Sequence, residues 1–167
     1  EEIGSEGVSG MQSEAFEHFM KTLCGMQSVE LTDCFANSFC ISADVTAAYD
    51  PNFSEVYERR NAAYVNYGVG LCKYTGSGGK GGASDASAEA MGHVRSTLDK
   101  AGVIWQIATL GKVDQGGGGT VAAYMANRNI VTVDAGVPVL SMHAPLELVS
   151  KLDCYETMLA CKAIYLA

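Results

Sequence analysis

Residues 39–45 read Phe-Cys-Ile-Ser-Ala-Asp-Val, a short apolar stretch that ends beside a carboxylate. This pattern predicts a buried strand with Asp44 at its carboxyl end. Further strand-like stretches occupy residues 65–74, 103–110, 130–133 and 137–140. Apolar residues at helical spacing recur between the strands, over residues 11–24, 86–101, 120–127 and 146–165. The alternation of the two patterns predicts an α/β fold.

Local signals set the expected ends of one of these helices. Ser84 or Asp85 is expected to cap the second helix, and Gly102 is expected to end it. In the last helix, residues 148, 152, 155 and 159 form one apolar stripe. Glycine is clustered at residues 76–82, which predicts a flexible loop, and at residues 116–119, which lead into a helix.

Composition excludes several functional classes. The chain has 167 residues, 48% of them hydrophobic, which suits one domain with a substantial core. Its formal net charge of −8 argues against nucleic acid as a partner, because phosphates select basic patches. No stretch approaches the ~20 consecutive apolar residues that span a bilayer, so no membrane partner is expected.

The six cysteines indicate a reducing compartment. No two of them form a Cys-x-x-Cys pair, which disfavours a zinc knuckle or a thioredoxin-like motif. Several lie in apolar strand-like or helical runs, as reduced core thiols do. We therefore expect a cytoplasmic protein. The chain begins with Glu1 rather than methionine, and we interpret it as part of a longer gene product.

Three segments carry side chains that can bind metal ions, at or near the ends of strands, where α/β folds bind substrates and cofactors. They carry the pair Glu1 and Glu2, then Asp44, then His143. Carboxylates and imidazole suit zinc or manganese. From spacing alone, each also has an ordinary structural explanation. The acidic pair could be solvated surface, the aspartate a turn or helix cap, and the histidine a packed core residue.

Several motifs, in this order along the chain, resemble those of one known enzyme family. Glu-Glu-Ile-Gly-Ser at 1–5, Ile-Ser-Ala-Asp-Val at 41–45 and Val-Leu-Ser-Met-His at 139–143 resemble the aspartyl aminopeptidase and aminopeptidase I family of dinuclear zinc exopeptidases. Further segments are similar to its bacterial, aminopeptidase I-like branch, at residues 49–53, 84–87, 116–120 and 141–145. The resemblance implies a three-layer α/β fold with helices on both faces of a mixed, mostly parallel sheet.

The resemblance also implies roles for individual residues. Glu1 would be the general base, Glu2 a ligand of one zinc ion, Asp44 a ligand of the other, and His143 a second ligand of the ion held by Glu2. The family's further ligands, a histidine and a bridging aspartate, precede the Glu-Glu pair, as does an inserted oligomerisation domain. We therefore expect residues 1–167 to be the C-terminal part of a single catalytic domain, without the upstream part and the inserted domain.

This ligand set limits what the isolated chain is expected to do. Two metal ions activate a bridging water, and a nearby carboxylate transfers its proton to the leaving amine. A catalytic zinc normally has three protein ligands, and neither ion reaches three within this chain. We expect weak zinc binding and no peptide hydrolysis by the chain alone. The complete protein is expected to be a homo-oligomer that acts on peptides.

Substrate contacts are implied less directly. The resemblance places Lys73 near the substrate, although it could equally be a solvated lysine at a strand end. Gly118 and Gly119 could form a backbone wall beside the substrate, or only a tight turn. Acidic-preferring members carry a histidine where this chain has Ala47, which favours a neutral or apolar first residue.

Two other functions stay open from the sequence. The chain could be a truncated homologue that acts as a non-catalytic assembly or interaction module. It could also be a small-molecule binding domain built on the turn at Gly116. In either case, an incomplete domain is expected to leave apolar surface and open sheet edges exposed.

Overall fold

A computed structural model describes residues 5–78, 81–112 and 114–167 of the chain. Its larger sheet has the strand order β1-β5-β3-β4. β1 (Phe39–Ser42) runs parallel to β5 (Val131–Gly136), β3 (Val69–Cys72) runs parallel to β4 (Trp105–Ala108), and β3 and β5 are antiparallel. The sheet is therefore mixed and mostly parallel, as the resemblance implies.

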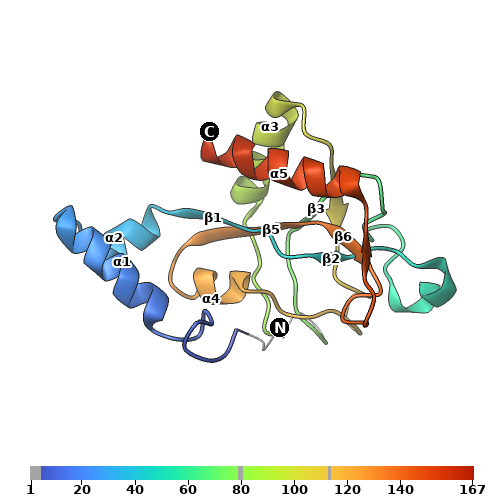
Figure 1. The fold of residues 1–167 in the computed structure, drawn as a ribbon, viewed down its shortest axis with the longest axis horizontal. Helices are drawn as coiled ribbons and strands as arrows, with labels where there is room; N and C mark the ends of the chain where they lie inside the picture. The colour runs from blue at the N-terminus through green and yellow to red at the C-terminus, as the bar shows by residue number, and fades with distance from the viewer. Residues whose placement is uncertain (1–4, 79–80, 113) are drawn as a thin grey trace.

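Helices cover both faces of this sheet (Figure 1). α3 (Ala88–Ala101) and α5 (Lys151–Tyr165) pack together on one face, and the short α4 (Ala122–Ala126) lies against β5 and β1 on the other. The main core forms between the sheet and the α3–α5 layer, where Leu71, Leu98 and Val133 are fully buried. The predicted α/β fold is confirmed.

A second, smaller sheet joins β2 (Thr46–Ala47), β6 (Pro138–Leu140) and β7 (Leu148–Val149) in that order. The stretch at 39–45 is therefore not one strand. β1 ends at Ser42, and the chain crosses into the smaller sheet, where the Thr46 amide donates to the Val137 carbonyl at 2.9 Å. The crossing places Asp44 between the two sheets.

α1 (Ala15–Met26) and α2 (Leu31–Ala36) form a helical hairpin at one side of the sheet. The rings of Phe16 and Phe35 stack inside the hairpin with centroids 5.8 Å apart. Arg128 ties the hairpin to α4, because its Nε donates to Glu17 at 2.6 Å and its Nη1 donates to the Tyr124 carbonyl. The six-residue α2 is too short to show a helical period, so the sequence does not predict it.

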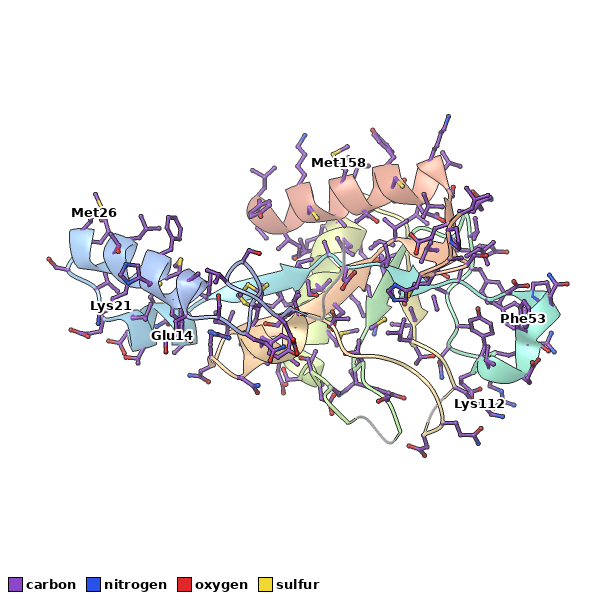
Figure 2. The ribbon with its side chains drawn as sticks, turned by 60° about the horizontal axis from the view of Figure 1, so that its bottom comes forward. Glu14, Lys21, Met26, Phe53, Lys112 and Met158 are labelled. Atoms are coloured by element: carbon purple, nitrogen blue, oxygen red, sulfur yellow. The ribbon has the colours of Figure 1, made fainter. Side chains whose placement is uncertain are left out.

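The far side of the molecule carries a second unpredicted element, the 3-10 helix η1 (Pro51–Val56). Asp50 caps it by accepting from the Asn52 amide. Figure 2 shows Phe53 on η1 and Met26 on α1 at opposite ends of the molecule. Both side chains are exposed.

Three local predictions have clear outcomes. Gly102 ends α3 in the left-handed conformation, with φ of 70°, as predicted. The α3 cap is Ser87, whose hydroxyl accepts from the Ala90 amide, so the expectation of Ser84 or Asp85 is wrong. The last helix begins only at Lys151, because residues 148–149 pair with β6 as β7, so its predicted start at residue 146 is also wrong.

Most of the apolar stripe of the last helix does not face the core, although Leu159 packs against it. Leu152 is 65% exposed and Tyr155 is 56% exposed, whereas the buried face of α5 carries Asp153, Thr157 and Ala160. Asp153 is fully buried because its carboxylate accepts from the amides of Asn66 and Gly68 at 2.8 and 2.9 Å. The segment before β3 is therefore fixed to α5 by one buried side chain.

All six cysteines are free thiols; Cys24 and Cys72 are buried, but Cys154 is exposed, so the expectation of core thiols is met only in part. Within the described ranges, no helix has both the length and the apolar character that membrane crossing requires.

Candidate functional site

Asp44 and His143, two of the predicted metal ligands, line the same cavity of about 340 Å³. Asp44 lies on the crossing between the two sheets, where its Oδ1 accepts from the Val45 amide at 2.8 Å. His143 lies three residues beyond β6 in the left-handed conformation, with φ of 65°, and its backbone amide donates to the Glu147 carboxylate. Both side chains are exposed to solvent.

Gly136, the last residue of β5, positions Asp44. A Cβ atom at residue 136 would lie 1.3 Å from the Asp44 carbonyl oxygen, which no real contact permits. Only glycine lets the crossing pass this close to β5. The backbone of Asp44 is therefore fixed by direct contact with the central strand of the larger sheet.

The tetraglycine loop, residues 116–119, forms another wall of the cavity. Gly118 and Gly119 thus line the same cavity as Asp44 and His143. The Gly76 amide donates to the Gly118 carbonyl at 2.7 Å, and a Cβ atom on Gly117 would lie 2.1 Å from the Gly76 carbonyl oxygen. The loop packs against the chain beyond β3 and is not a free surface turn.

The rest of the cavity lining is mostly apolar: Val45, Ala47, Val56, Tyr57, Leu110 and Met142. Val56 is the last residue of η1 and Tyr57 directly follows it, so this unpredicted element contributes to the cavity. Lys73 is not among the lining residues, and its ammonium forms an ion pair with Asp85. The structure therefore brings Asp44, His143, Gly118 and Gly119 together, and leaves Lys73 outside this group.

Glu1 and Glu2 lie outside the described residues. Among residues 5–78, 81–112 and 114–167, no group of three or more histidine, cysteine, aspartate or glutamate side chains is arranged to hold one metal ion. Asp44 and His143 still match the oxygen and nitrogen ligands that zinc prefers.

Asp134 on β5 is a residue that the sequence analysis missed. It is 6% exposed, and its Oδ1 accepts from the Thr120 hydroxyl at 2.7 Å. Burial raises the pKa of Asp134, the hydrogen bond from Thr120 and the proximity of the Ser42 hydroxyl oppose the change, and the negative charge of Asp44 adds to the rise. The available signal was a carboxylate inside the apolar run 130–137, where a buried charge needs a partner.

Cys72 lies beside Asp134, opposite it on β3. Burial raises the pKa of the Cys72 thiol to about 12, and the charge of Asp134 contributes to the rise, whereas contact with the Thr46 hydroxyl opposes it. The thiol is therefore protonated at neutral pH and is a packing residue and not a nucleophile.

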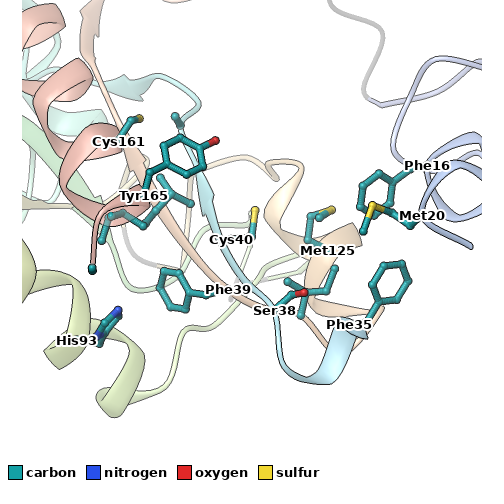
Figure 3. Close-up of a pocket in the computed structure, with 15 residues that line it drawn as sticks. Phe16, Met20, Phe35, Ser38, Phe39, Cys40, His93, Met125, Cys161 and Tyr165 are labelled. Atoms are coloured by element: carbon teal, nitrogen blue, oxygen red, sulfur yellow. The ribbon is translucent and has the colours of Figure 1, made fainter. Parts of the chain in front are cut away.

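A larger cavity of about 550 Å³ lies elsewhere, between the α1–α2 hairpin, β1 and the end of α5. Figure 3 shows Phe16 and Met20 on one side of it, Tyr165 on the other, and Cys40 of β1 between them. β1 is one of the two edge strands of its sheet. The exposed apolar surface and the open edge expected from the sequence are present, but the cavity does not include the predicted ligands.

The α/β fold places two candidate ligands, Asp44 and His143, at one cavity, and comparison with known proteins identifies the family. The family model described as "Aminopeptidase I zinc metalloprotease (M18)" matches residues 1–165. The chain belongs to this family.

Curated relatives support this assignment. A probable M18 family aminopeptidase 1 of Borreliella burgdorferi is 46% identical over 171 residues, which cover 99% of this chain and 37% of the relative. The Thermotoga maritima protein of the same description is 43% identical, over 98% of this chain and 38% of that protein. The chain thus spans somewhat more than a third of the length of these relatives.

Solved structures agree with the sequence relatives. The crystal structure of the Thermotoga maritima M18 aminopeptidase superposes with a TM-score of 0.92 at 42% identity, over 97% of this chain and 37% of that chain. Clostridium acetobutylicum aminopeptidase I gives a TM-score of 0.87 at 46% identity, over 96% and 35%. The S. cerevisiae mApe1 dodecamer, with a TM-score of 0.76 and 23% identity over 99% and 36%, shares the fold.

Proposed function

We propose that residues 1–167 form the C-terminal part of the catalytic domain of a metalloaminopeptidase, which removes N-terminal residues from peptides at a dinuclear zinc site. The observation that carries this proposal is the meeting of Asp44, His143 and the tetraglycine loop at one cavity. Asp44 and His143 are 99 positions apart in the sequence, the tetraglycine loop lies between them, and the three come from different elements.

The residues at the cavity fit zinc by their chemistry. Asp44 would bind one ion, and His143 together with Glu2 would bind the other. When bound, zinc polarises the scissile carbonyl and lowers the pKa of a coordinated water. Glu1 would take the proton from that water and deliver it to the leaving amine. The tetraglycine loop would position the peptide backbone.

The cavity lining supports a neutral or apolar N-terminal residue as the preferred substrate. The side chains of Val45, Val56, Leu110 and Met142 offer apolar contacts to a leucine-like side chain, and Ala47 brings no polar group. Lys73 remains a candidate substrate contact at the end of β3, although its partner in the structure is Asp85.

We further propose that the isolated chain binds zinc weakly and does not hydrolyse peptides, because neither ion would have three ligands from residues 1–167. The active protein would be a cytoplasmic homo-oligomer. The S. cerevisiae relative described as a dodecamer motivates the oligomer, and the free thiols motivate the compartment. Isothermal titration calorimetry tests the first point, and tight binding of two zinc ions accompanied by hydrolysis would contradict it.

A chimera tests the catalytic proposal. This chain replaces the matching segment of the Thermotoga maritima relative, and hydrolysis of leucyl and aspartyl p-nitroanilides is measured with zinc. The chimera should cleave the leucyl substrate in preference. Asp44→Asn and His143→Ala should each lower kcat/KM about a hundredfold or more, since metal ions contribute several kcal/mol.

His93→Ala is the matched control. His93 packs edge-on against Phe39 with ring centroids 5.3 Å apart, and it lines the larger cavity instead of the candidate site. Its removal should leave activity within about twofold of the unsubstituted chimera. Equal activity in Asp44→Asn, His143→Ala and His93→Ala would exclude the proposed site.

The alternative is a non-catalytic assembly module, and the exposed apolar surface around β1 and α5 favours it as the second candidate. A chimera that folds, binds zinc and assembles like its parent but cleaves no substrate would support the module and contradict the catalytic proposal.

A further inference from the structure

The buried carboxylate of Asp134 lies directly behind the candidate site. By strand register Asp134 is opposite Ser42 on β1 and Cys72 on β3, so the three side chains share one face of the larger sheet. The opposite face, which carries Leu71 and Val133, packs in the main core. Asp134 is therefore on the side of the sheet that α4 covers.

Thr120 connects this carboxylate to the tetraglycine loop. It is the residue that directly follows the loop, and its hydroxyl donates to Asp134 Oδ1 at 2.7 Å. The carbonyl of Thr120 also accepts from the Ala123 amide at the start of α4. Thr120 thus links the end of the loop to β5 through its side chain and to α4 through its backbone.

The other flank of the loop has an anchor of its own. The Gly118 carbonyl accepts from the Gly76 amide at 2.7 Å, and the Gly116 amide donates to the Lys112 carbonyl at 2.8 Å. Four consecutive glycines have more backbone freedom than any other tetrapeptide, so without anchors they would not keep one shape. Fixed on both flanks, the loop can present a constant wall to the cavity.

We propose that Asp134 is a positioning residue, which holds the tetraglycine wall of the candidate site in place through the Thr120 hydroxyl. In this role Asp134 acts through Thr120 and not by direct contact with a substrate or metal ion. Its role in peptide binding rests on the proposed function, whereas its role in ordering the loop concerns this chain alone.

Amide hydrogen exchange of this chain tests the ordering role. The amides of Gly76 and Gly116 report on the loop, because both donate hydrogen bonds at its flanks. Thr120→Val keeps the shape of the side chain but removes the donor, and should speed exchange of these amides about tenfold or more, since hydrogen bonds to charged groups are the stronger ones. Thr120→Ser keeps the donor and should exchange as the unsubstituted chain does.

Thr132→Val is the matched control, on the same strand as Asp134. The Thr132 hydroxyl is also buried, but it donates to the Ile130 carbonyl at 3.0 Å and not to the loop. Its loss should leave Gly76 and Gly116 unchanged. Exchange in Thr120→Val at the unsubstituted rate, or an equal increase in Thr132→Val, would overturn the proposal.

Asp134→Ala tests the acceptor directly. The double variant Thr120→Val/Asp134→Ala should exchange no faster than the faster single variant, because one hydrogen bond is lost in every case. Additive increases would show that the two residues act separately and would overturn the proposal. If circular dichroism shows that Asp134→Ala does not fold, the Thr120 variants and Thr132→Val decide the question.

The chimera adds the functional readout. Thr120→Val should raise KM for leucyl p-nitroanilide about tenfold with kcat changed less than about twofold, because a binding wall acts on bound substrate and transition state alike. Thr120→Ser, which keeps the donor, should have the KM of the unsubstituted chimera. If Thr120→Val speeds amide exchange but leaves KM unchanged, Asp134 orders the loop only, and its proposed role in peptide binding is overturned. A chimera without any activity would count against the proposed function, and the exchange experiment would still decide the positioning role.

Discussion

Gly136→Ala is predicted to be among the most destabilising single-methyl additions to this chain. The new Cβ would lie 1.3 Å from the Asp44 carbonyl oxygen and 2.5 Å from the carbonyl carbon, whereas real Cβ contacts are not shorter than 3.0 Å. One backbone must therefore move by about 1.7 Å. Neither can do so easily, because β5 is paired with strands on both sides and the Thr46 amide ties the crossing to the Val137 carbonyl.

We expect a loss of about 3 kcal/mol or more, at or above the upper end for overpacking, because the clash is with backbone and no rotamer relieves it. For a chain of this size, such a loss lowers Tm by about 6–12 °C. Urea unfolding followed by circular dichroism measures the change, as a lower midpoint at an unchanged m value.

Gly92→Ala is the matched control. Gly92 lies within α3, and a Cβ atom there would meet nothing within 4 Å. Alanine should stabilise this helix by about 0.5–1 kcal/mol. If Gly136→Ala unfolded within about 1 kcal/mol of the unsubstituted chain, the close approach of Asp44 to β5 would be wrong.

Three further predictions concern single polar side chains. Asp153→Ala should cost about 3 kcal/mol in denaturant unfolding, because two backbone amides lose their buried acceptor. Cys72, with a pKa of about 12, should resist alkylation at pH 8 while the exposed Cys154 reacts, as mass spectrometry would show. Because the Cys72 thiol keeps its proton in the folded state, the free energy of unfolding should fall as pH rises from 9 to 12, and Cys72→Ala should make this fall smaller. Arg128→Ala should speed hydrogen exchange in α1, and Arg128→Lys should not restore it, because one ammonium cannot replace the guanidinium bonds to Glu17 and to two carbonyls.

Most of the secondary structure could be predicted because the relevant signals are local. The helical period identified α1 and α3, and Gly102 marked the end of α3. The failures occurred where tertiary contacts override local pattern. Residues 148–149 continue the apolar period of α5, yet they pair with β6. The apolar stripe of α5 was assigned from helical spacing, but most of it is exposed, because the buried carboxylate of Asp153 selects another face of that helix.

The candidate site was predictable only in part, for a related reason. Asp44 and His143 follow apolar strand-like runs, and motif order assigned them chemistry, so their meeting at one cavity was expected. Asp134 was missed because the predicted strand stopped at residue 133, before the charge. The strand in fact continues to Gly136, because a hydroxyl fourteen residues earlier in the chain satisfies the buried carboxylate.

The glycine clusters show why composition alone misleads about rigidity. Clustered glycine predicts flexibility when each residue is considered by itself, because each has great backbone freedom. In the structure, glycine serves close approach instead. Gly117 packs on the Gly76 carbonyl and Gly136 packs on the Asp44 carbonyl, and a single methyl group would break either contact. The residues that allow the greatest freedom in the unfolded chain are thus the ones that bring the site's backbone segments together, and the neighbouring hydrogen bonds of Gly76 and Thr120 remove that freedom on folding.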